Sequence, residues 1–156
     1  MQSIVDMKTL VAAMADAVMV CDAKGLITLW NPAAERMFGH TEAQALGQSL
    51  DMIIPQRQQQ RHWDGYHQTM KTGVTKYGHD LLKVPALHKD GHTLSIAFTV
   101  SLLHAADGSV SGIAAVVRDE TARFAQERDT RKRITELEAQ LAAKTTAVAG
   151  QRGGGP

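Results

Sequence analysis

The segment from Leu94 to Thr121 constrains the fold of this chain more than any other part of the sequence. In its first half, apolar residues alternate with small or polar ones, and the apolar register contains Leu94, Ile96, Phe98, Val100 and Leu102. Because successive side chains of a strand point to opposite faces, this pattern predicts a long strand with one apolar face. Asp107-Gly108 predicts a turn, and residues 110–117 predict a partner strand that closes an antiparallel hairpin.

Short strands and helices are predicted before this hairpin. Strands are expected at residues 17–22, 26–30 and 75–87, with Pro85 pushing the last towards a sheet edge or a bulge. Helices are expected at residues 1–15, between Asn31 and Gly39, between Thr41 and Gly47 and at 56–71, with a tight helical turn at 52–55. Two groups of strands separated by helices predict an α+β fold, in which helices cover one face of an antiparallel sheet.

The composition changes after Thr121. Residues 122–144 are rich in Arg, Glu, Gln and Ala and contain neither glycine nor proline, which predicts a helix that leaves the domain. Its apolar residues fall near heptad positions at Ile134, Leu137, Leu141 and Val148, but Lys144 occupies the next d position, so a long coiled coil is not required. We therefore expect an N-terminal cap helix at 1–15, a domain at 16–121, an exit helix at 122–149 and a disordered tail at 150–156.

Charge and cysteine content exclude several classes of partner. A formal charge of +1 and an aromatic content of 4% argue against direct nucleic-acid binding and against attraction to an anionic membrane. Cys21 is the only cysteine, so the chain can form no internal disulfide and no cysteine zinc site, and a cytoplasmic location is expected. The longest apolar stretch near the N-terminus is interrupted by Asp16, which argues against a signal peptide or a membrane span.

Four short motifs, in this order and spacing, make residues 10–121 resemble a PAS domain. They are Asp22-Ala23-Lys24-Gly25 between two strands, Trp30 to Gly39 (close to N-x-A-x-x-x-x-F-G), Lys89-Asp90-Gly91, and Arg118-Asp119-Glu120-Thr121. The last motif resembles the family's D-[IV]-T exit signal, although Glu120 replaces the usual apolar residue. The resemblance implies a five-stranded antiparallel sheet, a lid of helices, a pocket between them and frequent homodimers.

The resemblance implies a scaffold and leaves the chemistry of the pocket open, because PAS pockets hold haem, flavin, small acids or nothing. Flavin photochemistry of the kind found in LOV domains needs a cysteine in an Asn-Cys-Arg helix. Cys21 lies in the first predicted strand instead, where a small buried core residue is expected. Flavin is therefore a weaker candidate than haem, and the cofactor stays undetermined at this point.

Two histidines are the candidate haem and metal ligands. His67 lies six residues before Gly73, which is similar to the proximal histidine of rhizobial oxygen-sensor PAS domains, and His79 lies near the position of their relatives' sixth ligand. Leu81 stands where those sensors place an arginine, so Lys76 or Lys83 would have to compensate. The expected cofactor contacts are completed by Met70, Leu81, Ala114 and Val116.

His62 is an alternative candidate. It precedes His67 by five residues, which separates the two side chains by about 140° around a helix, so at most one should enter a pocket. The alternative without a cofactor is that His67 and His79 are ordinary polar residues and that Arg61-His62-Trp63 docks the helix on the sheet. The other histidines fall at predicted turns or strand ends and are expected to be solvated, without metal: His40, His88, His92 and His104.

The function predicted from these features is a non-enzymatic sensory module. Arg118, Asp119 and Thr121 are the expected relay residues, because short polar side chains at a strand–helix junction cap the helix and fix its angle. The exit helix would pass a ligand or redox signal to a homodimer or to a regulatory partner in trans, with regulation of transcription as one output. A haem-based gas or redox sensor is the alternative, and the sequence contains no nucleophile–base pair or phosphate loop that predicts an enzyme.

Overall fold

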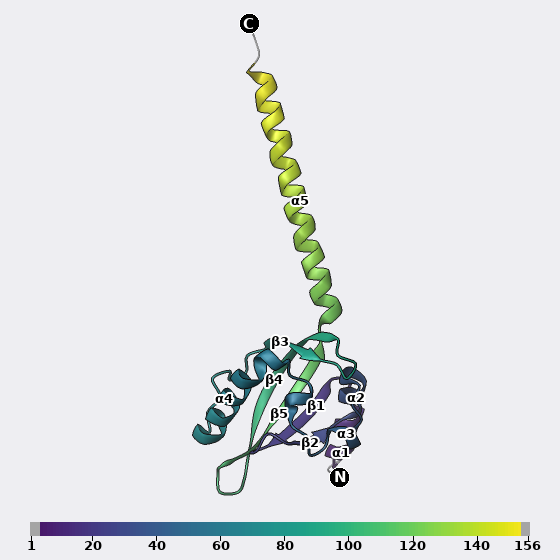
Figure 1. Ribbon diagram of the computed structural model, residues 1–156, viewed down its shortest axis with the longest axis vertical. Coiled ribbons are helices and arrows are strands. Elements are labelled where there is room, and N and C mark those ends of the chain that lie inside the picture. Colours follow the sequence, from purple (N-terminus) through teal and green to yellow (C-terminus); the bar gives the residue numbers. More distant parts are fainter. Residues whose placement is uncertain (1–3, 154–156) are drawn as a thin grey trace. The chain divides into compact units, whose positions relative to one another are not determined.

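The computed structural model describes residues 4–153 and divides the chain into two compact units, residues 1–120 and residues 121–156. In the first unit five strands form one antiparallel sheet in the order β2-β1-β5-β4-β3 (Figure 1). Their bounds are Ala17–Asp22 (β1), Ile27–Trp30 (β2), Leu82–Leu87 (β3), Thr93–His104 (β4) and Val110–Asp119 (β5). The predicted five-stranded antiparallel sheet is confirmed, and its last strand lies at the centre beside the first.

The helices of this unit precede and separate the two groups of strands. They are α1 (Met7–Ala13), α2 (Pro32–Phe38), α3 (Glu42–Ala45), the 3₁₀ turn η1 (Leu50–Met52) and α4 (Gln56–Thr72). Two predicted caps are confirmed: the Asn31 side chain accepts a hydrogen bond from the backbone of Ala34, and Thr41 with Gln44 forms a reciprocal capping box. These hydrogen bonds between residues three positions apart mark the starts of α2 and α3.

The hydrophobic core lies between the helices and one face of the sheet. Ala17, Met19 and Cys21 line it from β1, and Leu94 and Ile96 line it from β4. These two β4 residues confirm the predicted apolar register. Burial falls towards the end of β4 because β3 pairs with that strand only from Thr93 to Phe98, which leaves the rest of β4 with one neighbour.

Several predicted boundaries differ from the structure. β3 begins at Leu82 and not at residue 75, because turns occupy residues 76–79 and Gly78 adopts a positive φ of 54°. The helical turn predicted at 52–55 lies at 50–52, and α1 ends at Ala13, followed by extended Met14. The first three residues of the predicted cap helix lie outside the described part of the chain.

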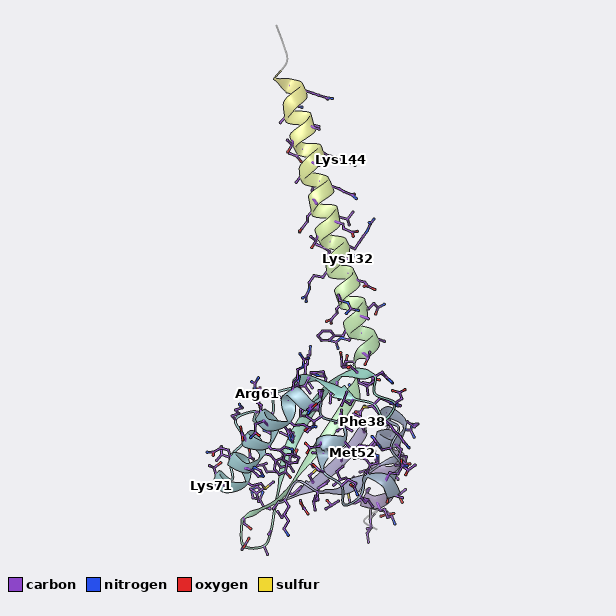
Figure 2. All side chains as sticks on the ribbon, viewed as in Figure 1. Phe38, Met52, Arg61, Lys71, Lys132 and Lys144 are labelled. Atoms are coloured by element: carbon purple, nitrogen blue, oxygen red, sulfur yellow. The ribbon has the colours of Figure 1, made fainter. Side chains whose placement is uncertain are left out.

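The second unit contains one helix, α5, which extends from Thr121 to Arg152. The helix therefore begins one residue before the predicted exit helix and continues into the first residues of the predicted disordered tail. Lys132 and Lys144 project from it (Figure 2), and its apolar stripe is exposed in the single chain at Ile134, Leu137, Leu141 and Val148. Within residues 4–153 we find no helix that is both long and apolar enough to cross a bilayer.

Candidate functional site

The inner face of α4 carries three rings that lie between this helix and the rest of the domain. Tyr66 is buried, and its hydroxyl donates a hydrogen bond to the backbone oxygen of Asp22 in β1. The indole N–H of Trp63 donates to Oδ1 of Asp51 at 2.6 Å. The rings of Trp63 and Tyr66 meet edge to face with centroids 5.2 Å apart. Two hydrogen bonds and this ring pair fix the rotation of α4 about its axis.

His62 is the histidine that this rotation directs towards the interior. Its ring lies 4.6 Å from Trp63 and 5.9 Å from Tyr66, measured between centroids. Its Nδ1 is buried and has no hydrogen-bond partner among the described residues. Burial lowers the pKa of His62, and the opposing effect of Asp51 is smaller, so the ring is neutral at physiological pH. A neutral imidazole with an unpaired nitrogen can accept a hydrogen bond from a ligand or bind a metal ion.

The turn between β1 and β2 receives the Trp63 ring. Gly25 in this turn has a φ of 81°, and a Cβ atom at that position would lie 2.3 Å from Cζ3 of Trp63. Only glycine therefore meets both requirements, the left-handed backbone and the close approach of the ring. The motif from Asp22 to Gly25 between the first two strands is thus also part of the surface on which α4 docks.

The two predicted iron ligands lie at the surface. His67 is exposed and its ring centroid is 6.1 Å from that of Trp63, while His79 is exposed in the segment between α4 and β3. Leu81 is 58% exposed. Of the predicted contacts on this side, only Met70 is half-buried and packs against the core. The structure therefore does not bring His67, His79 and Leu81 together inside the domain.

The alternation of β5 decides which of its small residues face the helices. Ile113, Ala115 and Val117 belong to the core side of the sheet. Ala114 and Val116 lie on the opposite face, since successive strand residues point in opposite directions. A ligand held between α4 and the sheet would meet Ile113 and Ala115 in place of the predicted Ala114 and Val116.

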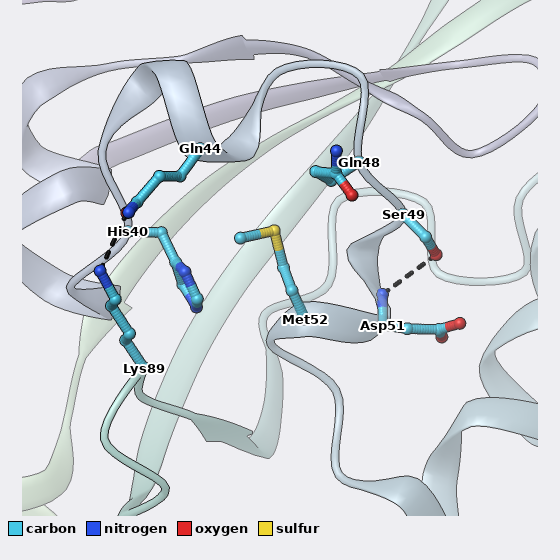
Figure 3. A pocket seen from close by; sticks show the side chains of 7 residues that line it. All are labelled: His40, Gln44, Gln48, Ser49, Asp51, Met52 and Lys89. Atoms are coloured by element: carbon cyan, nitrogen blue, oxygen red, sulfur yellow. Dashed lines mark hydrogen bonds between the residues drawn. The ribbon is translucent and has the colours of Figure 1, made fainter.

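An open cleft of about 470 Å³ lies beside η1 (Figure 3). It is lined by His40, Gln44, Gln48, Ser49, Asp51, Met52 and Lys89. The ammonium of Lys89 donates to Oε1 of Gln44 at 3.1 Å, and the backbone N–H of Asp51 donates to Oγ of Ser49 at 3.2 Å. Nε2 of His40 is buried without a partner among the described residues, and burial, followed by the nearby Lys89 and His88, lowers the pKa of this histidine.

Asp51 connects this cleft to α4, because it lines the cleft and its carboxylate accepts the indole hydrogen bond of Trp63. Sequence reasoning missed this residue. The available signal was the Ser49-x-Asp51 pattern of a helical-turn start, which identifies a cap but not the partner of the carboxylate. A polar ligand that engaged Asp51 would compete directly with the hydrogen bond that positions Trp63.

Cys21 is buried in β1, as the sequence predicts for a core residue. Burial is the main cause that raises the pKa of its thiol to about 12, with a smaller contribution from Asp22. The thiol therefore stays protonated at neutral pH and is a poor nucleophile.

The strand–helix junction contains the predicted relay residues. Asp119 is the last residue of β5 and Thr121 is the first residue of α5. Nε of Arg118 donates to both carboxylate oxygens of Asp16, at 3.0 and 3.1 Å. Asp16 directly precedes β1, so this ion pair joins the end of β5 to the start of β1.

The fold agrees with a comparison against known families, in which the model described as PAS fold matches residues 6–119. The chain belongs to the PAS family. A solved PAS domain from Colwellia psychrerythraea has the same fold, with a TM-score of 0.65, 23% identity, and coverage of 74% of this chain and 94% of that chain.

Curated relatives of this PAS domain include two sensor proteins. The sensor protein FixL of Bradyrhizobium diazoefficiens is 27% identical over 136 residues, or 86% of this chain and 26% of FixL. The oxygen sensor protein DosP of Escherichia coli is 28% identical over 108 residues, or 69% of this chain and 13% of DosP. The chain thus spans only a small part of the length of these two relatives.

Proposed function

We propose that this PAS domain detects a small ligand that binds beside His62, between α4 and the sheet. The observation that carries the proposal is the buried Nδ1 of His62, which has no partner among the described residues. A buried polar atom without a hydrogen bond costs about 1–3 kcal/mol, so a ligand that supplies a donor there gains that free energy on binding. The similarity to proteins named as sensors supports the same function.

The proposed relay runs from α4 through β1 to β5. Tyr66 of α4 is bonded to the backbone of Asp22, and Asp22 pairs with Gly112 of β5. A ligand that displaced the aromatic cluster would disturb this contact and shift the central strand. Arg118, Asp119 and Thr121 would carry that shift into α5, because only Glu120 separates β5 from the helix. No catalytic step belongs to this proposal.

Hydrogen exchange tests the relay. Tyr66→Phe removes only the hydroxyl that binds Asp22, and we expect faster amide exchange in β1 and β5 of the full chain. Tyr77→Phe is the matched control, because Tyr77 is 38% exposed and lies outside the described core. Equal exchange in the Tyr66→Phe variant and in the wild type would reject the relay through β1.

The output would be a homodimer formed through α5, or a regulatory partner in trans that controls transcription. The stripe of Ile134, Leu137 and Leu141 is exposed by 50, 46 and 67% in the single chain, which leaves it available for a second helix. Light scattering on the full chain should give the mass of a dimer, and Leu137→Glu should give that of a monomer. Lys132→Glu is the control, and a monomeric wild type would reject the dimer.

Haem is the second candidate ligand, and the neutral imidazole of His62 is the observation that favours it. The donor fits, because histidine nitrogen is a common axial ligand of haem iron. The packing fits less well, since Trp63 contacts the Gly25 turn and Tyr66 contacts Asp22, so both rings would have to move. When bound, haem supplies an iron atom that binds diatomic gases, and the protein would hold it through His62.

Reconstitution with haemin separates the candidate ligands. We expect a Soret band that shifts with carbon monoxide, that is lost in His62→Ala and that persists in His67→Ala and His79→Ala. Loss in His67→Ala or His79→Ala, with a normal spectrum in His62→Ala, would instead support the pair predicted from the sequence. Identical absorption of free haemin and of the mixture would reject haem and leave the small-ligand proposal to be tested by its own experiments.

A further inference from the structure

The turn between β3 and β4 gathers three groups that are typical metal ligands. Its sequence is His88-Lys89-Asp90-Gly91-His92, and the two histidine rings stack with centroids 4.5 Å apart. Nδ1 of His88 lies 3.1 Å from Oδ1 of Asp90, and Nδ1 of His92 contacts the same oxygen. One donor atom from each of the three residues lies within 4.8 Å of the others.

The backbone of this turn is held on several sides. The amide of His88 donates to the oxygen of His92, and the amide of Gly91 donates to the oxygen of His88, both at 2.9 Å. The amide of Lys89 donates to the oxygen of Phe38 at the end of α2, at 2.8 Å. A Cβ at Gly39 would lie 2.7 Å from Cε1 of His88, so this ring rests closely against the chain that follows α2. The fold therefore already orders the backbone at His88 and His92, two of the three candidate ligands.

We propose that His88, Asp90 and His92 form a binding site for a divalent transition-metal ion, with Zn²⁺ as the ion of best fit. Two imidazoles and one carboxylate suit zinc, whose bonds of about 2.0–2.2 Å place the donors of a tetrahedral ion about 3.4 Å apart. Both contacts between a histidine nitrogen and Oδ1 of Asp90 are shorter than this and must lengthen, and the ring of His92 must turn out of its stack with His88. Its side chain is 54% exposed, which permits that rotation.

A metal ion in this site would have three protein ligands, which leaves a coordination position open to water or to a donor from another molecule. The ammonium of Lys89 points away towards Gln44, to which it donates at 3.1 Å. The competing explanation is a plain turn, because Oδ1 of Asp90 also accepts from the backbone amide of His92 at 3.0 Å. The backbone amide of Asp90 also donates to Nδ1 of His88, at 3.2 Å. A turn cap thus uses the Asp90 carboxylate and the His88 ring but has no need of the His92 ring, and this difference defines the test.

Isothermal titration of the full chain, treated with chelator and then titrated with zinc chloride near neutral pH, measures the site directly. We expect one zinc ion per chain and an affinity that His92→Ala weakens by about tenfold or more. His104→Ala is the matched control, since His104 is an exposed histidine of the neighbouring β4 and should leave the affinity unchanged. Circular dichroism before titration verifies that each variant is folded.

A second variant keeps the proposal falsifiable if His92→Ala alters the turn. Asp90→Asn preserves the size of the side chain and its acceptor oxygen, so the turn cap survives while the charge of the metal ligand is lost. We expect this variant to bind zinc at least about tenfold more weakly, with an unchanged melting temperature in chelator. Wild-type affinity in both His92→Ala and Asp90→Asn, or no zinc binding by the wild type, would overturn the proposal.

Discussion

Replacement of Asn31 by alanine tests how far one side chain holds α1, β1 and α2 together. Asn31 is 3% exposed and uses its whole amide. The side-chain oxygen accepts from the backbone amides of Val18 at 2.9 Å and Ala34 at 3.0 Å. The side-chain nitrogen donates to the backbone oxygens of Val11 at 3.0 Å and Asp16 at 3.1 Å. One residue thus joins the end of α1 and the start of β1 to the start of α2.

The expected loss follows from these partners. Removal of the helix cap at Ala34 costs about 1 kcal/mol. The amide of Val18, a residue that is 8% exposed, would be buried without a partner at a cost of about 1–3 kcal/mol. We therefore expect Asn31→Ala to lower the free energy of unfolding by about 2–4 kcal/mol, a large part of the stability of a typical domain.

Urea unfolding followed by tryptophan fluorescence measures this loss, because both tryptophans, Trp30 and Trp63, lie in the first unit and do not report on α5. Thr41→Ala is the control, since it removes an exposed cap and should cost about 1 kcal/mol or less. If Asn31→Ala costs no more than Thr41→Ala, the buried hydrogen bonds do not carry the stability assigned to them here.

Three further predictions concern other parts of the chain. Gly25→Ala should lower the free energy of unfolding more than Gly108→Ala, because both glycines have a positive φ but only the first would meet Trp63; equal losses in urea would contradict this overlap. The Cys21 thiol should react with iodoacetamide far more slowly in the native protein than in urea, because its native pKa of about 12 keeps it protonated; equal rates would show that it is accessible. Lys144→Leu should strengthen self-association in sedimentation velocity, because it adds an apolar residue at a d position; an unchanged sedimentation coefficient would argue against pairing through this stripe.

The elements that could be predicted from the sequence are those that nearby residues stabilise. The caps of α2 and α3 join residues three positions apart, and the alternation in β4 reflects the periodicity of any half-buried strand. The start of β3 was predicted too early, because the turns at residues 76–79 and the positive φ of Gly78 interrupt the extended backbone before Leu82. Leu82 pairs with Phe98, the last residue of β4 that β3 reaches.

The choice between His62 and His67 could not be made from the sequence, for a related reason. Helical periodicity showed that His62 and His67 could not share a face, but it could not show which face is buried. Tyr66 and Trp63 decide this through contacts with Asp22, Gly25 and Asp51, which belong to other segments of the chain.

Which face of β5 is buried also could not be predicted from the sequence. The run from Ile113 to Val117 contains only small or apolar residues, so its sequence has no alternation that would mark the core side. Pairing with β1 places Ala115 beside Met19 and Ala114 beside Val20, and the core helices then cover the side of Ala115.

The α+β class, the caps, the hairpin and the PAS family could be predicted from the order of residues alone, because short-range hydrogen bonds and side-chain periodicity encode them within a few residues. Three arrangements became visible only in the folded chain: His62 faces inward, Asp51 holds Trp63, and His88 and His92 meet at Asp90. Those arrangements depend on packing between distant segments or on the path of a turn, and neither produces a periodic pattern in the sequence.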